Sequence, residues 1–142
     1  AATALLTLGE ELPSNIKCAV SDCAYTNCYE QYTYVLMHNA SIPAFPLLDL
    51  ANTVSKLRGN FDFRKASPID AVRHTAVPIL FIHGDKDDFV PYYMLNELFD
   101  ACVSEKEKLT IEGAVHACSA YKDPALYWET VKGFIAKHME EQ

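Results

Sequence analysis

Two residues of the sequence, Asp87 and His116, have the types and positions of an acid and a base that act together. Each lies in a polar loop directly after an apolar segment with the character of a β-strand. The interval between them leaves room for one helix and one strand, so the two loops are expected to leave neighbouring parallel strands at the same edge of a sheet. There a carboxylate can orient an imidazole and stabilise its protonated form. The pair therefore predicts general acid–base chemistry.

The nearby acids and histidines have plainer interpretations. Asp85 is expected to brace its loop by hydrogen-bonding its own backbone. Asp88 suits the cap of a following helix, and His83, at the end of a strand, is expected to hydrogen-bond within the sheet edge. Taken singly, Asp87 and His116 also fit a solvated acidic turn and an ordinary loop histidine, so their joint spacing carries the prediction.

Metal binding and thiol catalysis are not expected from the residue spacing. The five cysteines are odd in number and scattered, which indicates free thiols in a reducing, cytoplasmic compartment. Cys23 and Cys28 are not followed by a second close pair, and no histidines have ligand spacing, so no metal or cofactor is expected. Cys118 follows His116 closely, but nothing marks its thiol as activated. The nearest candidate hydroxyl nucleophiles do not lie in a strand-to-helix elbow and are discounted. They are Ser21, Thr26 and Ser119.

Helix and strand signals alternate along the chain and predict an α/β fold. The continuous apolar run at 78–83 is the clearest strand, and such a run implies cover on both faces, as in the middle of a parallel sheet. About three parallel strands with helices on both faces are expected. The other predicted elements are strands over 16–22 and 109–112 and helices over 1–8, 27–38 and 47–58, with further helices beginning near 67, 91 and 123. The last helix should bury a stripe of Tyr127, Val131, Phe134 and His138.

Composition limits the class of protein. The chain has 142 residues, half of them apolar, and a net charge of −7. It is long enough for one domain, or one part of a domain, with a real core. An acidic chain is a poor partner for nucleic acids and anionic membranes. The longest apolar run is far too short to span a bilayer.

The order of these signals resembles the α/β-hydrolase family. A strand ending in His-Gly-x-x-Asp-x-x-Val-Pro over 83–91, then a helix, a strand and Gly-Ala-x-His over 113–116, is similar to the family's acid and base segments. The likeness is greatest to bacterial serine esterases, acyl hydrolases and prolyl-peptidase-like members. It implies that Asp87 is the triad acid and His116 the triad base. It also implies that residues 1–142 form the C-terminal portion of one such domain, beginning just after the nucleophile elbow.

The family's nucleophile motif, Gly-x-Ser-x-Gly, does not occur in this sequence. One donor of the family's oxyanion hole would be missing with it. We therefore expect a parent protein that is a serine hydrolase of carboxylic esters or related acyl substrates, whereas this chain alone is inactive. The start without Met fits a piece of a longer polypeptide, and a membrane anchor in the missing half stays open.

The resemblance also suggests where a substrate lies. Segment 27–66 occupies the place of the family's variable cap and is expected to be a small helical insertion. Phe89 and Val115 flank the predicted acid and base and are expected to form pocket walls. Tyr25 is expected to line an acyl pocket, although the packing of two helices accounts for the aromatic residues of this region equally well.

A rival hypothesis is a non-catalytic α/β binding module, or a half-domain that assembles with a partner. If the chain is a fragment, strand 16–22 would lie at an exposed sheet edge that drives pairing. The expected partners are then a small-molecule acyl substrate, the N-terminal half of the same protein and a second copy of the chain.

Overall fold

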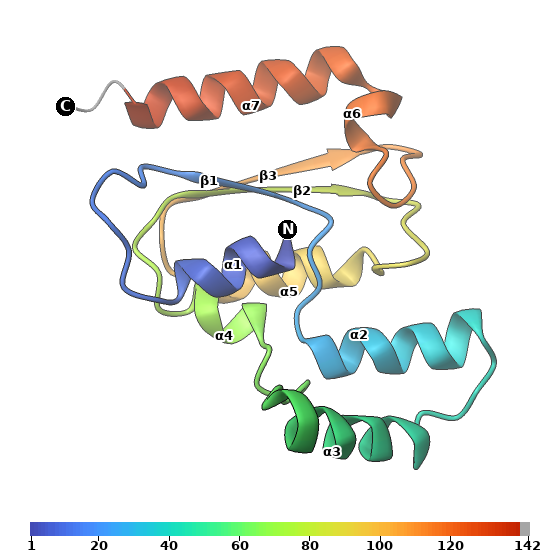
Figure 1. Ribbon diagram of the computed structural model, residues 1–142. Helices are drawn as coiled ribbons and strands as arrows, with labels where there is room; N and C mark the ends of the chain where they lie inside the picture. Colours follow the sequence, from blue (N-terminus) through green and yellow to red (C-terminus); the bar gives the residue numbers. More distant parts are fainter. Residues whose placement is uncertain (140–142) are drawn as a thin grey trace.

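The computed structural model describes residues 1–139, and its centre is a sheet of three parallel strands (Figure 1). The strands are β1 (Ala19–Asp22), β2 (Ile79–Gly84) and β3 (Lys106–Ile111), and they lie side by side in chain order. Ile79 is the register partner of Ala19 on one side and of Lys106 on the other. The predicted α/β class with three parallel strands is confirmed. β1 is shorter than expected, and β3 begins three residues earlier.

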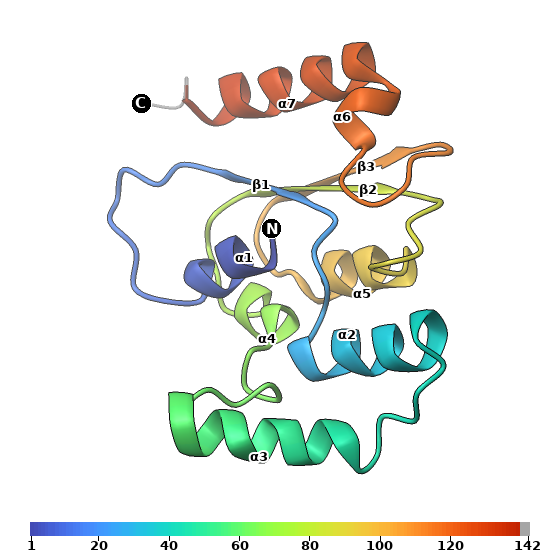
Figure 2. The same ribbon diagram turned by 45° about the vertical axis from the view of Figure 1, so that its right-hand side comes forward.

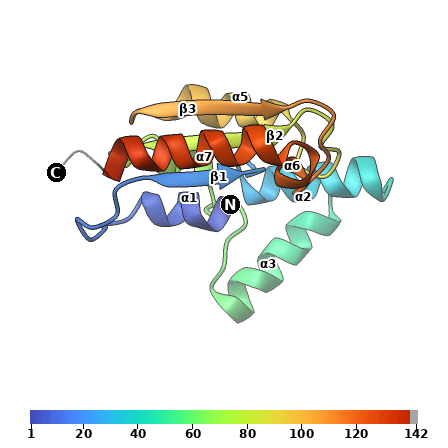
Figure 3. The same ribbon diagram turned by 90° about the horizontal axis from the view of Figure 1, so that it is seen from above.

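Helices cover both faces of this sheet. One face is covered by α1 (Ala2–Leu8), α4 (Pro68–Val72) and α5 (Tyr93–Ala101), and the other by α7 (Pro124–Met139) with the short α6 (Ser119–Lys122). Figures 2 and 3 show the same layers from two further directions, with α7 running along the three strands. Because each connection between strands carries at least one helix, all three strands end at the same edge.

The central strand β2 explains the apolar run in the sequence, because all six of its residues are buried. Its side chains alternate between two cores. Ile79 and Phe81 pack with α1, α4 and α5, whereas Leu80 and Ile82 pack with α7. The stripe expected on the last helix is confirmed, since all four of its members are buried: Tyr127, Val131, Phe134, His138.

Segment 27–66 forms a separate pair of helices that lies beyond α1, α4 and α5 (Figures 1 and 2). Helix α2 (Cys28–Tyr34) begins at Asn27, whose side-chain oxygen accepts hydrogen bonds from the N–H groups of Tyr29 and Glu30 at 2.8 and 3.3 Å. The Glu30 carboxylate binds the Thr26 hydroxyl at 2.6 Å. The helix expected to continue to residue 38 changes into a π-helical turn, η1 (Val35–Asn39). The role of this segment as a cap stays a prediction.

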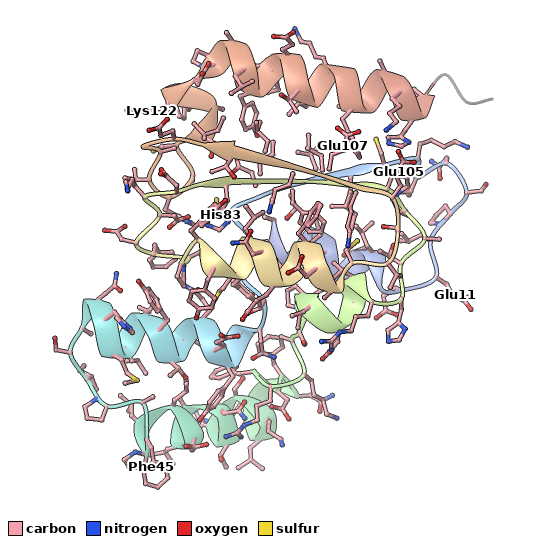
Figure 4. The ribbon with its side chains drawn as sticks, turned by 180° about the vertical axis from the view of Figure 1, so that it is seen from behind. Glu11, Phe45, His83, Glu105, Glu107 and Lys122 are labelled. Atoms are coloured by element: carbon pink, nitrogen blue, oxygen red, sulfur yellow. The ribbon has the colours of Figure 1, made fainter. Side chains whose placement is uncertain are left out.

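The helix expected from the spacing of apolar residues after Pro46 is confirmed as α3 (Leu47–Gly59). The apolar residues that predicted it, however, face outward. Leu50 is 64% exposed and Leu57 is 82% exposed, whereas Leu48 and Asn52 are buried. Asn52 is held by the N–H of Phe63 at 2.8 Å. In Figure 4, Phe45 marks the outer end of this helix pair, far from the sheet. Among residues 1–139, no helix is long and apolar enough to cross a membrane.

Gly84, the last residue of β2, allows two loops to approach each other closely. A Cβ atom at this position would lie 2.2 Å from the carbonyl oxygen of Ala114. That carbonyl also accepts a hydrogen bond from the N–H of Lys86 at 3.0 Å. The absence of a side chain here therefore brings the loop after β2 against the loop after β3.

We predict that Gly84→Ala lowers the free energy of unfolding by roughly 1–3 kcal/mol, because the added methyl group must push backbone atoms apart. Gly133→Ala is the matched control. A Cβ there meets nothing within 4 Å, and alanine in a helix interior is favoured over glycine by about 1 kcal/mol. Urea unfolding of both variants measures the difference. Equal stability of the two variants would contradict the close approach.

Candidate active site

The carboxylate of Asp87 is enclosed by hydrogen-bond donors. Its side chain has no exposed surface. Oδ1 accepts hydrogen bonds from the backbone N–H groups of Phe89 at 3.0 Å and Val90 at 2.8 Å. Oδ2 lies 2.8 Å from Nδ1 of His116 and 3.1 Å from Nε2 of His83. Donors from a strand and two loops thus compensate a buried negative charge.

These contacts decide the ionisation of the carboxyl group. Burial alone raises the pKa of Asp87, because a low-dielectric surrounding disfavours the charged form. Hydrogen bonds from His83, His116 and Val90 act in the opposite direction and outweigh burial, so that the pKa is lowered from its ordinary value. Asp87 is therefore a carboxylate at neutral pH.

His83 is a part of this site that the sequence did not reveal. Its ring is completely buried, and Nε2 lies 2.9 Å from the carbonyl oxygen of Val90. A carbonyl oxygen only accepts, so Nε2 must carry a proton, which it shares between Val90 and Asp87. Figure 4 shows His83 at the end of the sheet where the loops gather. The hydrogen bonding expected of His83 is made to the loop at this sheet edge, where His83 also holds the acid in place.

His116 lies in the loop after β3, and its side chain is 34% exposed. The contact between its Nδ1 and Asp87 implies a proton on Nδ1, because the carboxylate can only accept. Nε2 is then the proton-accepting atom of the ring. The ring of Phe89 lies against the imidazole, with 4.9 Å between ring centroids. The structure thus brings together the predicted acid, the predicted base and one predicted pocket wall.

Asp85 joins the two loops that carry the pair. Its Oδ1 accepts a hydrogen bond from the N–H of Gly113 at 2.6 Å. Gly113 has a φ of 70°, in the left-handed region that glycine adopts readily. The side chain expected to brace its own loop therefore ties the acid's loop to the base's loop.

The other residues predicted to bind substrate are placed differently. Val115 precedes His116 in the loop and is 48% exposed, like Phe89 at 44%. Tyr25 instead packs against the core on the α1 and α5 face. Burial and the neighbouring Cys28 raise the pKa of Tyr25 to about 12. Within residues 1–139 no hydrogen bond joins Tyr25 to Asp87 or His116, and its role in an acyl pocket stays a prediction.

Cys23 is a second member of the site that sequence reasoning missed. It directly follows β1 with a φ of 51°, and its N–H donates to the carbonyl oxygen of Ile82 at 2.9 Å. Its Sγ, an Asp87 oxygen and a His116 ring nitrogen all lie within 4.8 Å of one another. Burial, followed by the charge of Asp22, raises the thiol pKa to about 12. The thiol is therefore protonated at neutral pH, which disfavours it as a nucleophile.

We predict that Asp87→Asn destabilises the protein most at neutral pH. A carboxyl group with a lowered pKa in the folded state stabilises that state above its unfolded pKa of about 3.9. This contribution is lost as the pH falls through the folded-state pKa. Urea unfolding of the wild type and the variant should give a constant stability difference above about pH 5 and a shrinking one below about pH 4. A difference that stays constant into acid would contradict the lowered pKa.

Comparisons with known proteins place this geometry in a wider group. No protein-family model matches the sequence. The uncharacterized protein YqkD of Bacillus subtilis (strain 168) is 32% identical over 135 residues, which cover 95% of this chain and 44% of that protein. This chain thus spans less than half of that curated relative.

Solved structures share the arrangement at low sequence identity. The acylaminoacyl peptidase of Pyrococcus horikoshii superposes with a TM-score of 0.73 at 14% identity, over 99% of this chain and 23% of that one. An esterase of Pyrococcus furiosus gives 0.68 at 17% identity, over 97% of this chain and 50% of that one. The esterase domain of a Rhodothermus marinus protein also gives a TM-score of 0.68 at 17% identity, over 96% of this chain and 56% of that one.

At these identities the likeness is one of fold, and it extends over nearly the whole chain. The predicted parallel sheet, the helices on both of its faces and the order of the loops agree with it. The chain therefore has the α/β-hydrolase fold, of which it represents the portion that carries Asp87 and His116.

Proposed function

We propose that the protein to which this chain belongs is a serine hydrolase of carboxylic esters or related acyl compounds. In this proposal Asp87 is the acid and His116 the base of its catalytic triad. The observation that carries the proposal is the 2.8 Å contact between the buried Asp87 carboxylate and the partly exposed His116 ring. A fully buried acid and an accessible base are the arrangement that proton transfer to a substrate requires.

The steps follow from this geometry. Asp87 keeps a proton on Nδ1 of His116, so Nε2 accepts the proton of a serine hydroxyl as that hydroxyl attacks the acyl carbon. The imidazolium that forms is stabilised by the adjacent carboxylate, and it returns the proton to the leaving group. The serine would come from a part of the protein outside these 142 residues, since the sequence contains no Gly-x-Ser-x-Gly.

Two further observations support an acyl substrate. Phe89 and Val115 present partly exposed apolar side chains beside His116, which suits the walls of a pocket for an organic substrate. The peptidase and the esterases with the same fold are named for reactions of the acyl-transfer class. We propose the same class for this protein and leave the length of the acyl group open.

Segment 27–66 is proposed to act as a cap over this site. The side-chain amide of Gln31 on α2 donates to the carbonyl oxygen of Phe89 at 2.6 Å. The Tyr93 hydroxyl, at the start of α5, donates to the Glu30 carboxylate at 3.2 Å. The helix pair is therefore fastened to the loop that carries Asp87, where a cap would be able to influence the substrate.

We predict that His116→Ala lowers kcat/KM for a short-chain p-nitrophenyl ester by about 10³-fold or more in the full-length protein. The reason is the loss of the group that carries the proton in this proposal. His74→Ala is the matched control, because His74 is an exposed histidine that follows α4 and lies outside the proposed cap. Unchanged hydrolysis after His116→Ala would end the proposal.

The unpaired edge of β1 favours a second candidate function. In this alternative the chain is a half-domain that assembles with a partner. Within residues 1–139, β1 pairs only with β2. The N–H groups of Ala19 and Cys23 point to the β2 side, so by alternation that of Val20 points to the free edge. Free edges of this kind recruit further strands.

We predict that chain 1–142, produced alone, self-associates or binds the N-terminal part of its protein. Val20→Pro should weaken this association, because proline removes an N–H from the free edge while the pairing with β2 is kept. Sedimentation velocity measures the effect. Monomeric behaviour of the unmodified chain across the micromolar range would count against assembly through β1.

A further inference from the structure

A third metal-ligating side chain lies beside the acid–base pair, and the proposed hydrolysis does not use it. The Sγ atom of Cys23, a carboxylate oxygen of Asp87 and a ring nitrogen of His116 all lie within 4.8 Å of one another. The three residues follow β1, β2 and β3 respectively. The linear sequence conceals the cluster, because its members come together only through the shared edge of the parallel sheet.

The backbone holds the thiol in this position. Cys23 has a φ of 51°, and Ala117, which follows His116, has a φ of 55°. Positive φ values are uncommon for residues with a side chain and persist where the surrounding structure imposes them. The backbone of Ala117 lies near the Cys23 thiol and acts to lower its pKa, against the larger effect of burial. The thiol and the base thus each lie at or beside a residue of constrained backbone conformation.

We propose that Cys23, Asp87 and His116 form a binding site for a zinc ion, and that the bound ion inhibits hydrolysis. A thiolate, a carboxylate and a neutral imidazole are all ordinary zinc ligands. Their combined charge cancels that of Zn²⁺, which suits a partly buried site. On binding, the thiol releases its proton to solvent, and water completes the tetrahedral coordination. The inhibitory part of this inference rests on the proposed function, whereas the binding part does not.

The distances require only small movements. With Zn–N of about 2.0–2.1 Å and Zn–O of about 2.0–2.2 Å, two tetrahedral ligand atoms lie about 3.3 Å apart. The Asp87 oxygen and Nδ1 of His116 are 2.8 Å apart, so the ion would widen this contact by about 0.5 Å. The Cys23 sulfur would move closer, since Zn–S is about 2.3 Å.

The ion would replace one hydrogen bond of Asp87 and leave the others in place. Oδ1 would keep the N–H groups of Phe89 and Val90, and Oδ2 would keep Nε2 of His83. Such outer contacts orient a ligating carboxylate and strengthen metal binding. The neutral imidazole has a single basic nitrogen. Zinc at Nδ1 shifts the proton of the ring from Nδ1 to Nε2, so neither nitrogen stays free to act as a base.

The test uses the full-length protein and Co²⁺ as a spectroscopic probe for the zinc site. A thiolate that ligates Co²⁺ gives a charge-transfer absorption band in the near ultraviolet. We expect this band in the wild type and in Cys118→Ser, and its loss in Cys23→Ser. Cys118 is the matched control, because it is a free, partly exposed cysteine two positions past His116. Absence of the band in the wild type, or its persistence in Cys23→Ser, would overturn the proposal.

Zinc affinity is measured on the same proteins by competition with a chromophoric chelator. Cys23→Ser and His116→Ala should each weaken zinc binding by about tenfold or more, and Cys118→Ser should not. Circular dichroism confirms that each variant is folded, and Cys23→Ala serves as a second replacement. Equal zinc affinity of Cys23→Ser, Cys23→Ala and the wild type would also overturn the site.

Hydrolysis of a p-nitrophenyl ester separates the two proposals. Each protein's rate with Zn²⁺ is divided by its own rate after chelation, and we expect strong inhibition in the wild type and Cys118→Ser but not in Cys23→Ser. Equal inhibition of all three would overturn inhibition through this site. The wild type could lack esterase activity when metal-free and still show the band once Co²⁺ is added. That result would contradict the proposed function and support the metal site.

Discussion

The buried carboxylate of Asp87 is the group around which the loops at the carboxyl edge of the sheet are arranged. An unpaired carboxylate in such a place costs several kcal/mol, so the chain must surround it with donors or leave it protonated. Asp87 is surrounded: two backbone N–H groups of its own loop, one imidazole from β2 and one from the loop after β3 reach it. The loop conformations are those that bring these donors to one point. The orientation of His116 is a consequence of that requirement.

The rest of the fold serves to hold those donors. The buried strand β2 ends in His83 and Gly84, one of which donates to the acid while the other lets the loop of the base approach. Helices on both faces exclude water from this strand. Asp85 fixes the second loop through Gly113. The site is therefore a product of the sheet edge, to which β1 contributes Cys23.

Much of this arrangement could be predicted from local patterns. A continuous apolar strand and a periodic last helix are visible in the sequence because burial on two faces and burial on one stripe have different periods. Asp87 and His116 were found because each follows a strand. Cys23 was missed because its neighbours in the site lie in loops distant in sequence, and spacing carries no record of such contacts. His83 reaches Asp87 and Val90 within its own segment, but a histidine at a strand end does not indicate which loop atoms its ring will contact.

The helix pair shows a different limit. The apolar repeat of α3 correctly predicts a helix, yet Leu50 and Leu57 face outward while the polar Asn52 is buried. Periodicity reports that a stripe exists but not what covers it. Asn52 is buried because it satisfies the N–H of Phe63 and the carboxylate of Asp62, which are contacts of the irregular segment after the helix.

The contact between Asp87 and His116 is tested most directly by the protonation of the His116 ring. Nitrogen-15 NMR of histidine-labelled protein, recorded in alkaline solution where an ordinary imidazole is neutral, distinguishes the two ring nitrogens. The structure predicts a proton on Nδ1 of His116, held by the carboxylate, and its redistribution in Asp87→Ala. A His116 ring with its proton on Nε2 in the wild type, unaffected by that substitution, would contradict the account.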